Sequence, residues 1–330
     1  MAELRAGLIG LGMMGRHHAR VLASLEGVRL VAVADPAGDP HGVAGDRPLL
    51  RSVEELVAAG LDYCVVAVPT GLHESVGLAL AEAGVHALIE KPLAHDVSAS
   101  TALVEAFEGA GLVGAVGHIE RFNPALQSLR TRLEAGELGG LYQVATRRQG
   151  PFPARIADVG VVKDLATHDI DLTAWVTQQD YATVSAQTAH RSGREHEDLV
   201  AATCRLAGGT VTSHLVNWLS PFKERVVVVT GRKGAFVADT LTADITFHSN
   251  GEVATTWEAI ARFRGVSEGD TVRYAIPKPE PLRTEHEHFR DAVLGKDTDI
   301  VTLAQGRQTV RVAEAMIASA RNGNAVELGA

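Results

Sequence analysis

The sequence predicts an α/β fold, with a doubly wound parallel sheet followed by an α+β domain built on a large, mostly antiparallel sheet. The chain of 330 residues is longer than one small core requires. Strand-like and helix-like segments alternate regularly over residues 4–118. From about residue 140 to 247 the chain reads mainly as strands between Gly-rich or polar turns. We therefore expect one domain at residues 1–120 and a second at 121–330.

Apolar runs and turn signals place the elements of the first domain. We expect strands at residues 4–10, 29–34, 63–68, 85–89 and 112–116. Helices are expected between them at residues 16–25, 73–83 and 96–109. Ser52, followed by Glu55 three residues later, predicts the capping box of a further short helix. Because strands and helices alternate, the sheet should be parallel and covered by helices on both faces.

The pattern changes near residue 117. Asn123 and Pro124 predict a helix start, because Asn is a good N-cap and Pro suits the first helical position. Strands are then expected at residues 144–148, 182–188, 199–206, 210–216, 226–230 and 236–239, with one helix at 168–177. Gly208-Gly209 predicts a hairpin turn. Two closing helices, at about 284–294 and 303–322, can pack back on the first domain.

Composition narrows the classes of protein to consider. Apolar residues make up 46% of the chain and charged residues 22%, as in ordinary globular proteins. A net charge of −9 disfavours a general nucleic-acid binder but allows an anionic substrate. The start of the chain lacks a signal pattern, and no apolar run reaches the roughly 18 residues of a membrane span, so we expect a cytoplasmic protein. Cys64 and Cys204 lie in strand-like runs and should be buried, and the histidines form no ligand motif, so no metal site is expected.

A glycine-rich turn at residues 10–15 reads GLGMMG, follows a predicted strand and opens a predicted helix. Asp35 lies 20 positions after Gly15, at the end of the next strand, which completes the fingerprint of a Rossmann dinucleotide-binding domain. Gly10 permits the tight turn, Gly12 lets the pyrophosphate approach, and Gly15 allows close helix packing. The Asp35 carboxylate would accept hydrogen bonds from ribose hydroxyls and repel a 2′-phosphate, so NAD is favoured over NADP.

Glu90-Lys91-Pro92 directly follows the predicted strand at residues 85–89. Ligands of open α/β sheets bind outside the carboxyl ends of the strands, so Lys91 should face the nicotinamide end of the cofactor. There its charge would favour an alkoxide that develops during oxidation of an alcohol. The alternative is a surface lysine at a strand end. The sequence leaves open whether the Lys91–Pro92 bond is cis.

Together with the glycine turn and Glu90-Lys91-Pro92, two further motifs carry a family resemblance. These are Ala67-Val68-Pro69-Thr70 with His73, and Asp164-Leu165-Ala166-Thr167-His168. The chain resembles the glucose-fructose oxidoreductase / inositol dehydrogenase / MocA family along nearly its whole length. The resemblance implies an NAD(P)-dependent oxidoreductase of sugars, cyclitols or nucleotide sugars, assembled as a homodimer or homotetramer through its C-terminal sheet. With the fingerprint it adds the following expected cofactor contacts: Met13, Met14, Pro69, Thr70, His73, Glu90 and Lys91.

Asp164 and His168 are four residues apart, which places both side chains on one face of a helix. A carboxylate orients a neighbouring imidazole and stabilises its cation, which suits general-base work near neutral pH. The alternative is an N-cap aspartate beside an incidental surface histidine. We expect Lys91, His168 and Asp164 to be the catalytic residues. His168 is favoured as the proton acceptor, although the sequence leaves the choice between His168 and Lys91 open.

A narrower resemblance concerns the substrate. Residues 117–124, 150–155 and 217–221 are similar to those of enzymes that oxidise UDP-N-acetylhexosamines, or the derived uronates, at C3. Candidate contacts to the diphosphate or to sugar hydroxyls are Arg121, Asn123, Arg155 and Asn217. Lys163 is a further substrate candidate, with a surface role as the alternative, and Asp171 is expected either to hydrogen-bond substrate or to support His168. His17 and His18 follow the glycine turn and should pack near the cofactor phosphates without a catalytic role.

Three functions are consistent with these residues. The leading one is an NAD-dependent dehydrogenase of a sugar or nucleotide sugar. The second is an inositol or free-sugar dehydrogenase with the same machinery. The third is an NAD(P)-binding regulator that has lost catalysis; the presence of Lys91, Asp164 and His168 argues against it, because a regulator has no need of all three.

Overall fold

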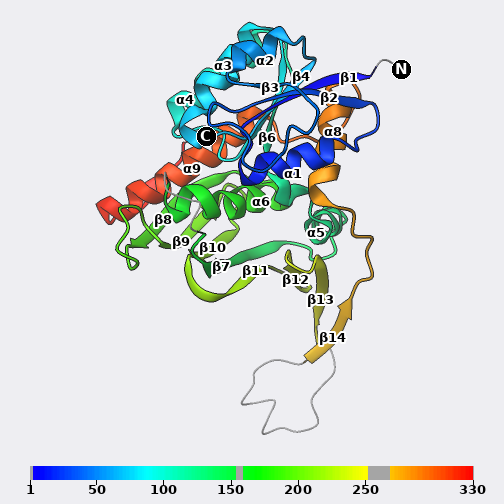
Figure 1. Ribbon diagram of the computed structural model, residues 1–330. Helices are drawn as coiled ribbons and strands as arrows, with labels where there is room; N and C mark the ends of the chain where they lie inside the picture. The colour runs from blue at the N-terminus through cyan, green and yellow to red at the C-terminus, as the bar shows by residue number, and fades with distance from the viewer. Residues whose placement is uncertain (1–2, 154–158, 252–267, 330) are drawn as a thin grey trace, which may run out of the picture. The chain divides into compact units, whose positions relative to one another are not determined.

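The computed structural model describes residues 3–153, 159–251 and 268–329 (Figure 1). The chain divides into two compact units, each built from two separate stretches. The first unit comprises Met1–Ile119 and Pro279–Glu314, and the second comprises Glu120–Lys278 and Ala315–Ala330. Residues 279–314 thus belong to the first unit, although in the sequence they lie between the two stretches of the second.

The first unit is built on a six-stranded sheet in the order β3-β2-β1-β4-β5-β6. All of its strand pairs are parallel, as predicted. The strands are β1 (Leu4–Ile9), β2 (Val28–Ala34), β3 (Leu49–Leu50), β4 (Tyr63–Val66), β5 (His86–Glu90) and β6 (Gly114–Gly117). The strand β3 was not predicted, because two residues are too few to show a hydrophobic pattern.

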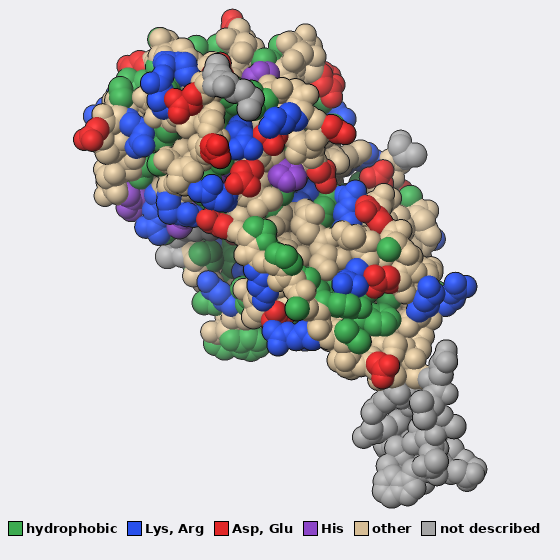
Figure 2. All heavy atoms as spheres, turned by 90° about the vertical axis from the view of Figure 1, so that its right-hand side faces the viewer, with side chains coloured by type: hydrophobic (Ala, Val, Ile, Leu, Met, Phe, Trp, Pro, Cys, Tyr) green, Lys and Arg blue, Asp and Glu red, His purple; other side chains and the backbone are tan. Residues whose placement is uncertain are grey.

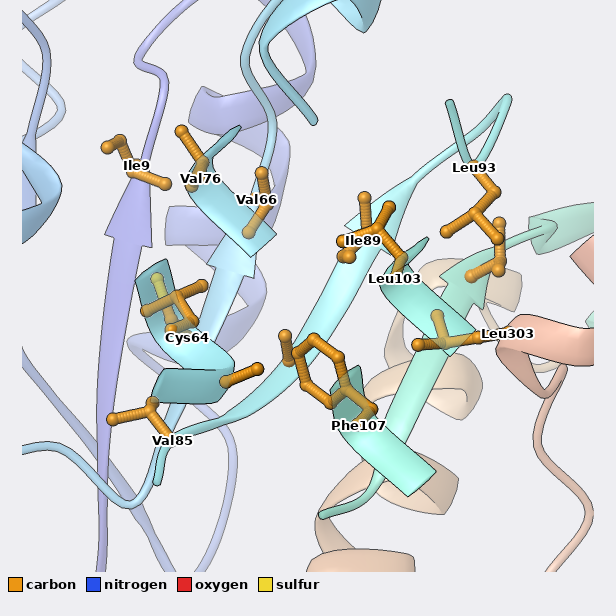
Figure 3. Close-up of a cluster of buried hydrophobic side chains, with 14 of the residues drawn as sticks. Ile9, Cys64, Val66, Val76, Val85, Ile89, Leu93, Leu103, Phe107 and Leu303 are labelled. Atoms are coloured by element: carbon orange, nitrogen blue, oxygen red, sulfur yellow. The ribbon is translucent and has the colours of Figure 1, made fainter. Parts of the chain in front are cut away.

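Helices cover both faces of this sheet (Figure 1). They are α1 (Met13–Leu22), α2 (Val53–Ala58), α3 (His73–Glu82), α4 (Val97–Gly109), α8 (Pro281–Val293) and the first part of α9 (Leu303–Asn322). Helices α2, α3, α4 and α9 share one hydrophobic cluster with the sheet, which includes Cys64, Ile89, Leu103, Phe107 and Leu303 (Figure 3). Helices α1 and α8 share a second cluster with the opposite face. Burial of each large apolar side chain contributes about 1.5–3 kcal/mol to stability.

The cap predicted at Ser52 is confirmed, and Asp96 supplies a second cap in this unit. The Ser52 hydroxyl accepts a hydrogen bond from the backbone N–H of Glu55 at 3.3 Å. The Glu55 carboxylate accepts from the N–H of Arg51 at 2.8 Å, one residue earlier than a standard capping box would place it. Asp96 caps α4 by accepting from the N–H of Ala99 at 2.8 Å. These caps fix where the loops leave the sheet.

The second unit is built on a nine-stranded sheet in the order β14-β13-β12-β11-β7-β10-β9-β8-β15. Its pairs are antiparallel except for the parallel pair β7–β10, so the sheet is mostly antiparallel, as predicted. The strands are β7 (Leu141–Pro151), β8 (Tyr181–Ala189), β9 (Leu199–Leu206), β10 (Val211–Asn217), β11 (Leu219–Gly231), β12 (Gly234–Asp239), β13 (Asp244–Asn250), β14 (Glu268–Arg273) and β15 (Val326–Glu327). The sequence pattern missed β13, β14 and β15, and it shortened β7 and β11.

One face of this sheet packs on α5 (Pro124–Glu134) and α6 (Thr167–Thr177), whose apolar side chains share a cluster with β7, β11 and β12. Asn123 and Pro124 start α5 as predicted, since the Asn123 side chain accepts from the N–H of Ala125. On the other face exposed apolar side chains include those of Val211 and Leu215. A hollow of about 600 Å³ lies on the sheet, lined by residues of β7, β8, β9, β10 and β11.

The surface mixes charges of both signs. Figure 2 shows basic and acidic side chains interspersed with hydrophobic ones over the face in view. Some of these charges form exposed ion pairs, such as Arg29 with Glu3 and Arg283 with Glu287. Each such pair stabilises the fold by at most about 1 kcal/mol. Within the described part of the chain, no helix is both long enough and apolar enough to cross a membrane.

Candidate active site

The glycine turn between β1 and α1 leaves space for a diphosphate. Gly10 has φ 92°, in the left-handed region, and a side chain there would collide with the carbonyl of Ala67. A side chain on Gly15 would collide with the carbonyl of Gly10, which explains why helix and turn can pack so closely. Gly12 is the N-cap of α1, with no capping side chain and no heavy atom within 4 Å of the place of a Cβ. The first backbone N–H groups of α1, including those of Met13 and Met14, are thus available to an anion, which fits the pyrophosphate of a dinucleotide.

Asp35 follows β2 at the same edge of the sheet. Its Oδ2 accepts a hydrogen bond from the N–H of Leu11 at 2.8 Å, and its Oδ1 accepts from the N–H of Ala37 at 2.8 Å. Each carboxylate oxygen keeps a further lone pair for a ribose hydroxyl. The exposed side chain of Arg51, at the end of β3, donates to the carbonyl of Pro36 at 3.0 Å. Sequence reasoning missed this arginine, because it reaches the Asp35 turn from the neighbouring strand rather than from the residues that follow Asp35.

We predict that Asp35→Ser shifts cofactor preference toward NADP. The substitution removes the charge that repels a 2′-phosphate and leaves Arg51 to attract one. Loss of about 1–3 kcal/mol of repulsion corresponds to a change of roughly 5- to 150-fold in the NAD/NADP affinity ratio. Titration of the protein with each oxidised cofactor measures this ratio.

Asp46→Ser is the matched control, because Asp46 is exposed and lies in the same loop. It should leave the ratio unchanged, whereas Arg51→Ala in the Asp35→Ser background should lower the gain for NADP. An unchanged ratio in Asp35→Ser would contradict the assignment of Asp35 to the ribose.

Lys91 follows β5, and the Lys91–Pro92 peptide bond is cis. Because the strands are parallel, the loops after β1, β4 and β5 all leave the same edge of the sheet. Gly12, Pro69 and Lys91 therefore share that edge, and Thr70 begins a short 3₁₀ turn (Thr70–Leu72) beside them. This is the arrangement that the motif order predicts for the nicotinamide end of the cofactor site.

His73 ties two of these loops together. Its Nδ1 lies 2.9 Å from the carbonyl oxygen of Pro92, and its Nε2 lies 3.0 Å from that of Val68. Burial lowers the pKa of this imidazole, against the opposing effect of the carbonyl groups. Both ring nitrogens thus lie against backbone carbonyls, and the one that carries the proton donates to its carbonyl, so His73 packs between the two loops beside the Lys91 turn. Its predicted direct contact with the cofactor stays a prediction.

Glu90 points into the first unit rather than toward solvent. Its Oε1 lies 2.9 Å from His18 Nε2, and its Oε2 accepts from the N–H of Lys91 at 3.1 Å. The contact of Glu90 with the cofactor therefore stays a prediction, while its contact with the Lys91 backbone is direct. His18 is fully buried against Glu90, which is a more specific role than the packing near phosphates that the sequence suggested.

In the second unit Asp164 lies inside a π-helical turn (Val162–Ala166), and His168 follows in the first turn of α6. Asp164 is buried and its N–H donates to the carbonyl of Gly160 at 3.0 Å, so it is not the N-cap of this helix. The alternative of an N-cap aspartate is therefore wrong. Single π-helical turns occur frequently at functional sites. Lys163 is half-buried in the same turn.

The start of this helix is held by Glu197, which sequence reasoning missed. Its carbonyl accepts from the N–H of Val161 at 2.9 Å, and its Oε1 accepts from the N–H of Val162 at 3.1 Å. The side chain of the next residue, Asp198, accepts hydrogen bonds from the backbone N–H groups of Arg191 and Ser192 in its own loop. Because Glu197 lies 35 residues from the helix it caps, no local pattern reveals it.

Two buried ion pairs fix α6 within the second unit. Arg121 forms a bidentate pair with Asp171, with Nε–Oδ2 and Nη2–Oδ1 distances of 2.8 and 2.6 Å. Arg148 on β7 pairs with Asp169 at 2.7 Å and with Glu120 at 2.8 Å. Burial opposes the charge of Arg148, but Asp169 and Glu120 outweigh it and raise the arginine pKa. Because Asp169 and Asp171 follow His168 within one turn of α6, these pairs fix the helix that carries His168.

The remaining substrate candidates are also tied into the second unit. Asn123 caps α5 and donates to the carbonyl of Thr240 at 2.9 Å. Asn217 donates to Gln149 at 3.1 Å and accepts from the N–H of Leu219 at 3.0 Å. Arg121 and Asp171 are paired with each other as described above, and Arg155 lies outside the described residues. Substrate contact by Arg121, Asn123, Arg155, Lys163, Asp171 and Asn217 therefore stays a prediction, with a structural role now visible for Arg121, Asn123, Asp171 and Asn217.

Comparison with known proteins decides the family. Residues 4–118 match the model described as oxidoreductase family, NAD-binding Rossmann fold, and residues 126–237 match the GFO/IDH/MocA C-terminal domain. The chain belongs to the Gfo/Idh/MocA family of oxidoreductases. The family resemblance, the fold class and NAD as the cofactor are thereby confirmed.

Relatives of this Gfo/Idh/MocA protein act on sugars and cyclitols. It is 34% identical over 216 residues to UDP-N-acetylglucosamine 3-dehydrogenase of Acidithiobacillus ferrooxidans, an alignment that covers 64% of this chain and 66% of that protein. It is 31% identical over 193 residues to scyllo-inositol 2-dehydrogenase (NAD(+)) of Bacillus subtilis, covering 56% of each chain. The alignments thus span less than two thirds of these curated relatives.

Solved structures extend the likeness to almost the whole chain. The UDP-N-acetylglucosamine 3-dehydrogenase of A. ferrooxidans superposes with a TM-score of 0.85 at 27% identity, over 98% of this chain and 99% of that one. A dehydrogenase of Bordetella pertussis, solved with NADH and UDP-GlcNAcA, superposes with a TM-score of 0.83 at 23% identity, over 100% and 99% of the two chains. At 23% identity, the likeness to the B. pertussis structure shows a shared fold and no more.

In the described part of this Gfo/Idh/MocA chain, no group of three or more His, Cys, Asp or Glu side chains could hold a metal ion. Both cysteines, Cys64 and Cys204, are buried, as expected, and both are free thiols. Burial raises the pKa of each thiol, so neither is activated as a nucleophile.

Proposed function

We propose that this protein is an NAD-dependent dehydrogenase that transfers a hydride between a secondary alcohol of a sugar or nucleotide sugar and nicotinamide. Lys91 carries the proposal, because it leaves the same sheet edge as the glycine turn that fits the cofactor diphosphate. Binding of NAD alone needs no lysine there, whereas oxidation of an alcohol needs a group that stabilises the developing alkoxide. The C3 hydroxyl of a UDP-N-acetylhexosamine is our preferred alcohol, supported by the similarity to a dehydrogenase named for that reaction.

The proposed division of labour uses three side chains. NAD, when bound, supplies the hydride acceptor. Lys91 donates a hydrogen bond to the reacting oxygen and stabilises its negative charge. His168 accepts the hydroxyl proton, and Asp164, buried in the π-helical turn, favours the cationic form of the imidazole. Which of Lys91 and His168 is the formal acid/base is tested by the variants discussed below.

The proposed assembly is a homodimer or homotetramer that buries the open face of the second unit's sheet. Val211 and Leu215 expose large apolar side chains on that face, in the manner of an interaction surface. Light scattering that gave the mass of one chain would contradict this. The proposed location is the cytoplasm, as the sequence predicts.

We expect NADH to form with UDP-N-acetylglucosamine at a higher kcat/KM than with myo-inositol or glucose. The free sugars lack the diphosphate, and each lost hydrogen bond to a charged group weakens binding by about 1.5–3 kcal/mol, or roughly 10- to 150-fold. The absorbance of NADH measures each rate.

A preference for myo-inositol would instead support the cyclitol dehydrogenase. Tight NAD binding without turnover on a broad panel of sugars and nucleotide sugars would support the regulator and contradict the proposed activity. Reduced cofactor that stays bound through turnover would indicate an oxidoreductase that recycles it with a second substrate.

A further inference from the structure

A buried array of polar side chains connects three elements of the first unit at the carboxyl end of β5. His18 comes from α1, Glu90 ends β5, and His286 comes from α8, more than 250 residues later in the chain. His18 and His286 are both 0% exposed, and Glu90 is buried with them. His18 Nδ1 lies 2.8 Å from His286 Nε2, and His18 Nε2 lies 2.9 Å from Glu90 Oε1. Neither histidine belongs to the motifs that identify the family.

Hydrogen-bond chemistry fixes the role of Glu90 in this array. Glu90 Oε2 accepts the backbone N–H of Lys91, so the carboxylate is an acceptor on that side. An ionised carboxylate accepts only, and His18 then donates its Nε2–H to Oε1. The second bond of His18 is satisfied by His286 in both charge states of the His18 ring: neutral His18 accepts the His286 N–H, and cationic His18 donates to the His286 lone pair. His286 thus serves as the backing partner of His18.

Charge supports the same assignment. Burial alone would raise the pKa of Glu90, but the hydrogen bond and charge of His18 and the charge of Lys91 outweigh it, so the pKa is lowered. The next carboxylate, Glu285, has no hydrogen-bond partner for either oxygen in the described structure. Burial and the charge of Glu90 raise the pKa of Glu285 well above its usual value, so Glu285 is neutral. One of two neighbouring buried carboxylates is ionised, and it is the one beside Lys91.

Packing leaves the Glu90 side chain little freedom. A Cβ at Gly117, on the adjacent strand β6, would lie 3.2 Å from Glu90 Cδ and 3.3 Å from Oε2. The carboxylate is therefore held between His18 on one side and the Gly117 backbone on the other. A buried charge fixed in this way acts on a neighbouring ammonium much more strongly than one in water.

We propose that Glu90, held by His18 and His286, is a positioning residue that fixes the Lys91 backbone, attracts the charged Lys91 side chain and so aims it at the reacting oxygen. This inference rests on the proposed function, because it assigns Lys91 a place in hydride transfer. His18 and His286 act through Glu90, and Glu90 acts through Lys91. None of the three is proposed to touch the substrate.

The first test separates turnover from cofactor binding. Glu90→Gln keeps the shape and removes the charge, and we expect kcat to fall about 10- to 100-fold, the range found for the residues that orient metal ligands through hydrogen bonds. KM for NAD should change by less than about threefold, because the glycine turn is untouched. Glu285→Gln is the matched control: the same substitution at a neighbouring carboxyl that is already neutral should leave kcat and thermal stability unchanged.

The second test asks whether His18 acts through Glu90. His18→Gln can still donate to the carboxylate and should retain most of kcat, whereas His18→Leu cannot and should lose as much as Glu90→Gln. In the Glu90→Gln background, His18→Leu should cost little more, because residues that act through one another are non-additive. If His18→Leu does not fold, the Glu90→Gln and His18→Gln variants still decide the question. Equal losses in His18→Gln and His18→Leu, or fully additive losses, would overturn the proposal.

A third readout needs no substrate. Acylation of Lys91 by an amine-selective reagent, followed by peptide mass spectrometry, should be about 3- to 10-fold faster in Glu90→Gln, because the Lys91 side chain loses the electrostatic attraction that holds it in place. An unchanged rate would overturn the inference even if the enzyme is active. A faster rate in a protein that oxidises no alcohol would support the Glu90–Lys91 link while contradicting the proposed function.

Discussion

Replacing either Lys91 or His168 by alanine is expected to lower kcat by about 10²- to 10⁴-fold, the usual range for general acid–base groups. Lys91→Ala removes the charge that stabilises the alkoxide, and His168→Ala removes the proposed proton acceptor. Both losses act on the transition state, so kcat and kcat/KM should fall together while affinity for NAD is retained. Steady-state NADH formation and a separate NAD titration measure the two effects.

Matched controls come from exposed residues of the same types. Lys296→Ala and His248→Ala should leave kcat near wild type, because both side chains lie at the surface, Lys296 beside Asp291 and His248 beside Thr271. Near-wild-type turnover in both Lys91→Ala and His168→Ala would contradict the assignment. A large loss in Lys91→Ala alone would make Lys91 the acid/base and remove His168 from that role.

The fold of the first unit could be predicted because its constraints are local. Strands buried on both faces of a parallel sheet read as continuous apolar runs, and the helices between them begin at capping residues such as Ser52 and Asp96. The glycine turn could be predicted for a related reason. Gly10 and Gly15 each stand where a side chain would strike a backbone carbonyl, so the residue type itself reports the geometry.

The second unit was harder to predict, because several of its constraints are not local. The strand β13 buries few of its side chains, so it shows little hydrophobic pattern. The π-helical turn that carries Asp164 depends on one extra residue in the helical ladder, which no residue type announces. The ion pair of Arg148 with Asp169 joins residues 21 positions apart, and the bond from Arg148 to Glu120 joins residues 28 positions apart.

The same difference between local and distant constraints explains which residues of the candidate site could be predicted. Sequence motifs predicted the residues expected to contact cofactor and substrate, including Lys91 and His168, because their chemistry limits the residue types that can serve. The supporting residues escaped prediction. His18 and His286 are joined across 268 positions, and Glu197 holds the start of the helix that carries Asp164 across 35. Such partners become visible only when the fold brings their elements together.

Arg148→Met is expected to lower the free energy of unfolding of the second unit by about 3–5 kcal/mol, because it leaves two carboxylates in the interior without their cation. The Arg148 side chain is 3% exposed and pairs with Asp169, itself 2% exposed, and with Glu120. After the substitution, Asp169 would lose the arginine and keep the hydrogen bond from the Thr146 hydroxyl. Urea unfolding followed by tryptophan fluorescence measures the change, since Trp175 and Trp218 both lie in this unit.

The neighbouring arginine provides the control. Arg147 lies on the same strand as Arg148 and pairs with Glu224 of β11, but it is 58% exposed, so Arg147→Met should change stability by no more than about 1 kcal/mol. Adding Asp169→Leu to Arg148→Met should restore part of the loss, because a buried ion pair replaced as a whole by apolar residues is often tolerated. Equal effects of the two arginine substitutions would contradict a dominant role for the buried pair. Because Asp169 follows His168 directly, Arg148→Met should also lower kcat by more than the fraction of unfolded protein explains. Such a loss would link the stability of this helix to the chemistry proposed for His168.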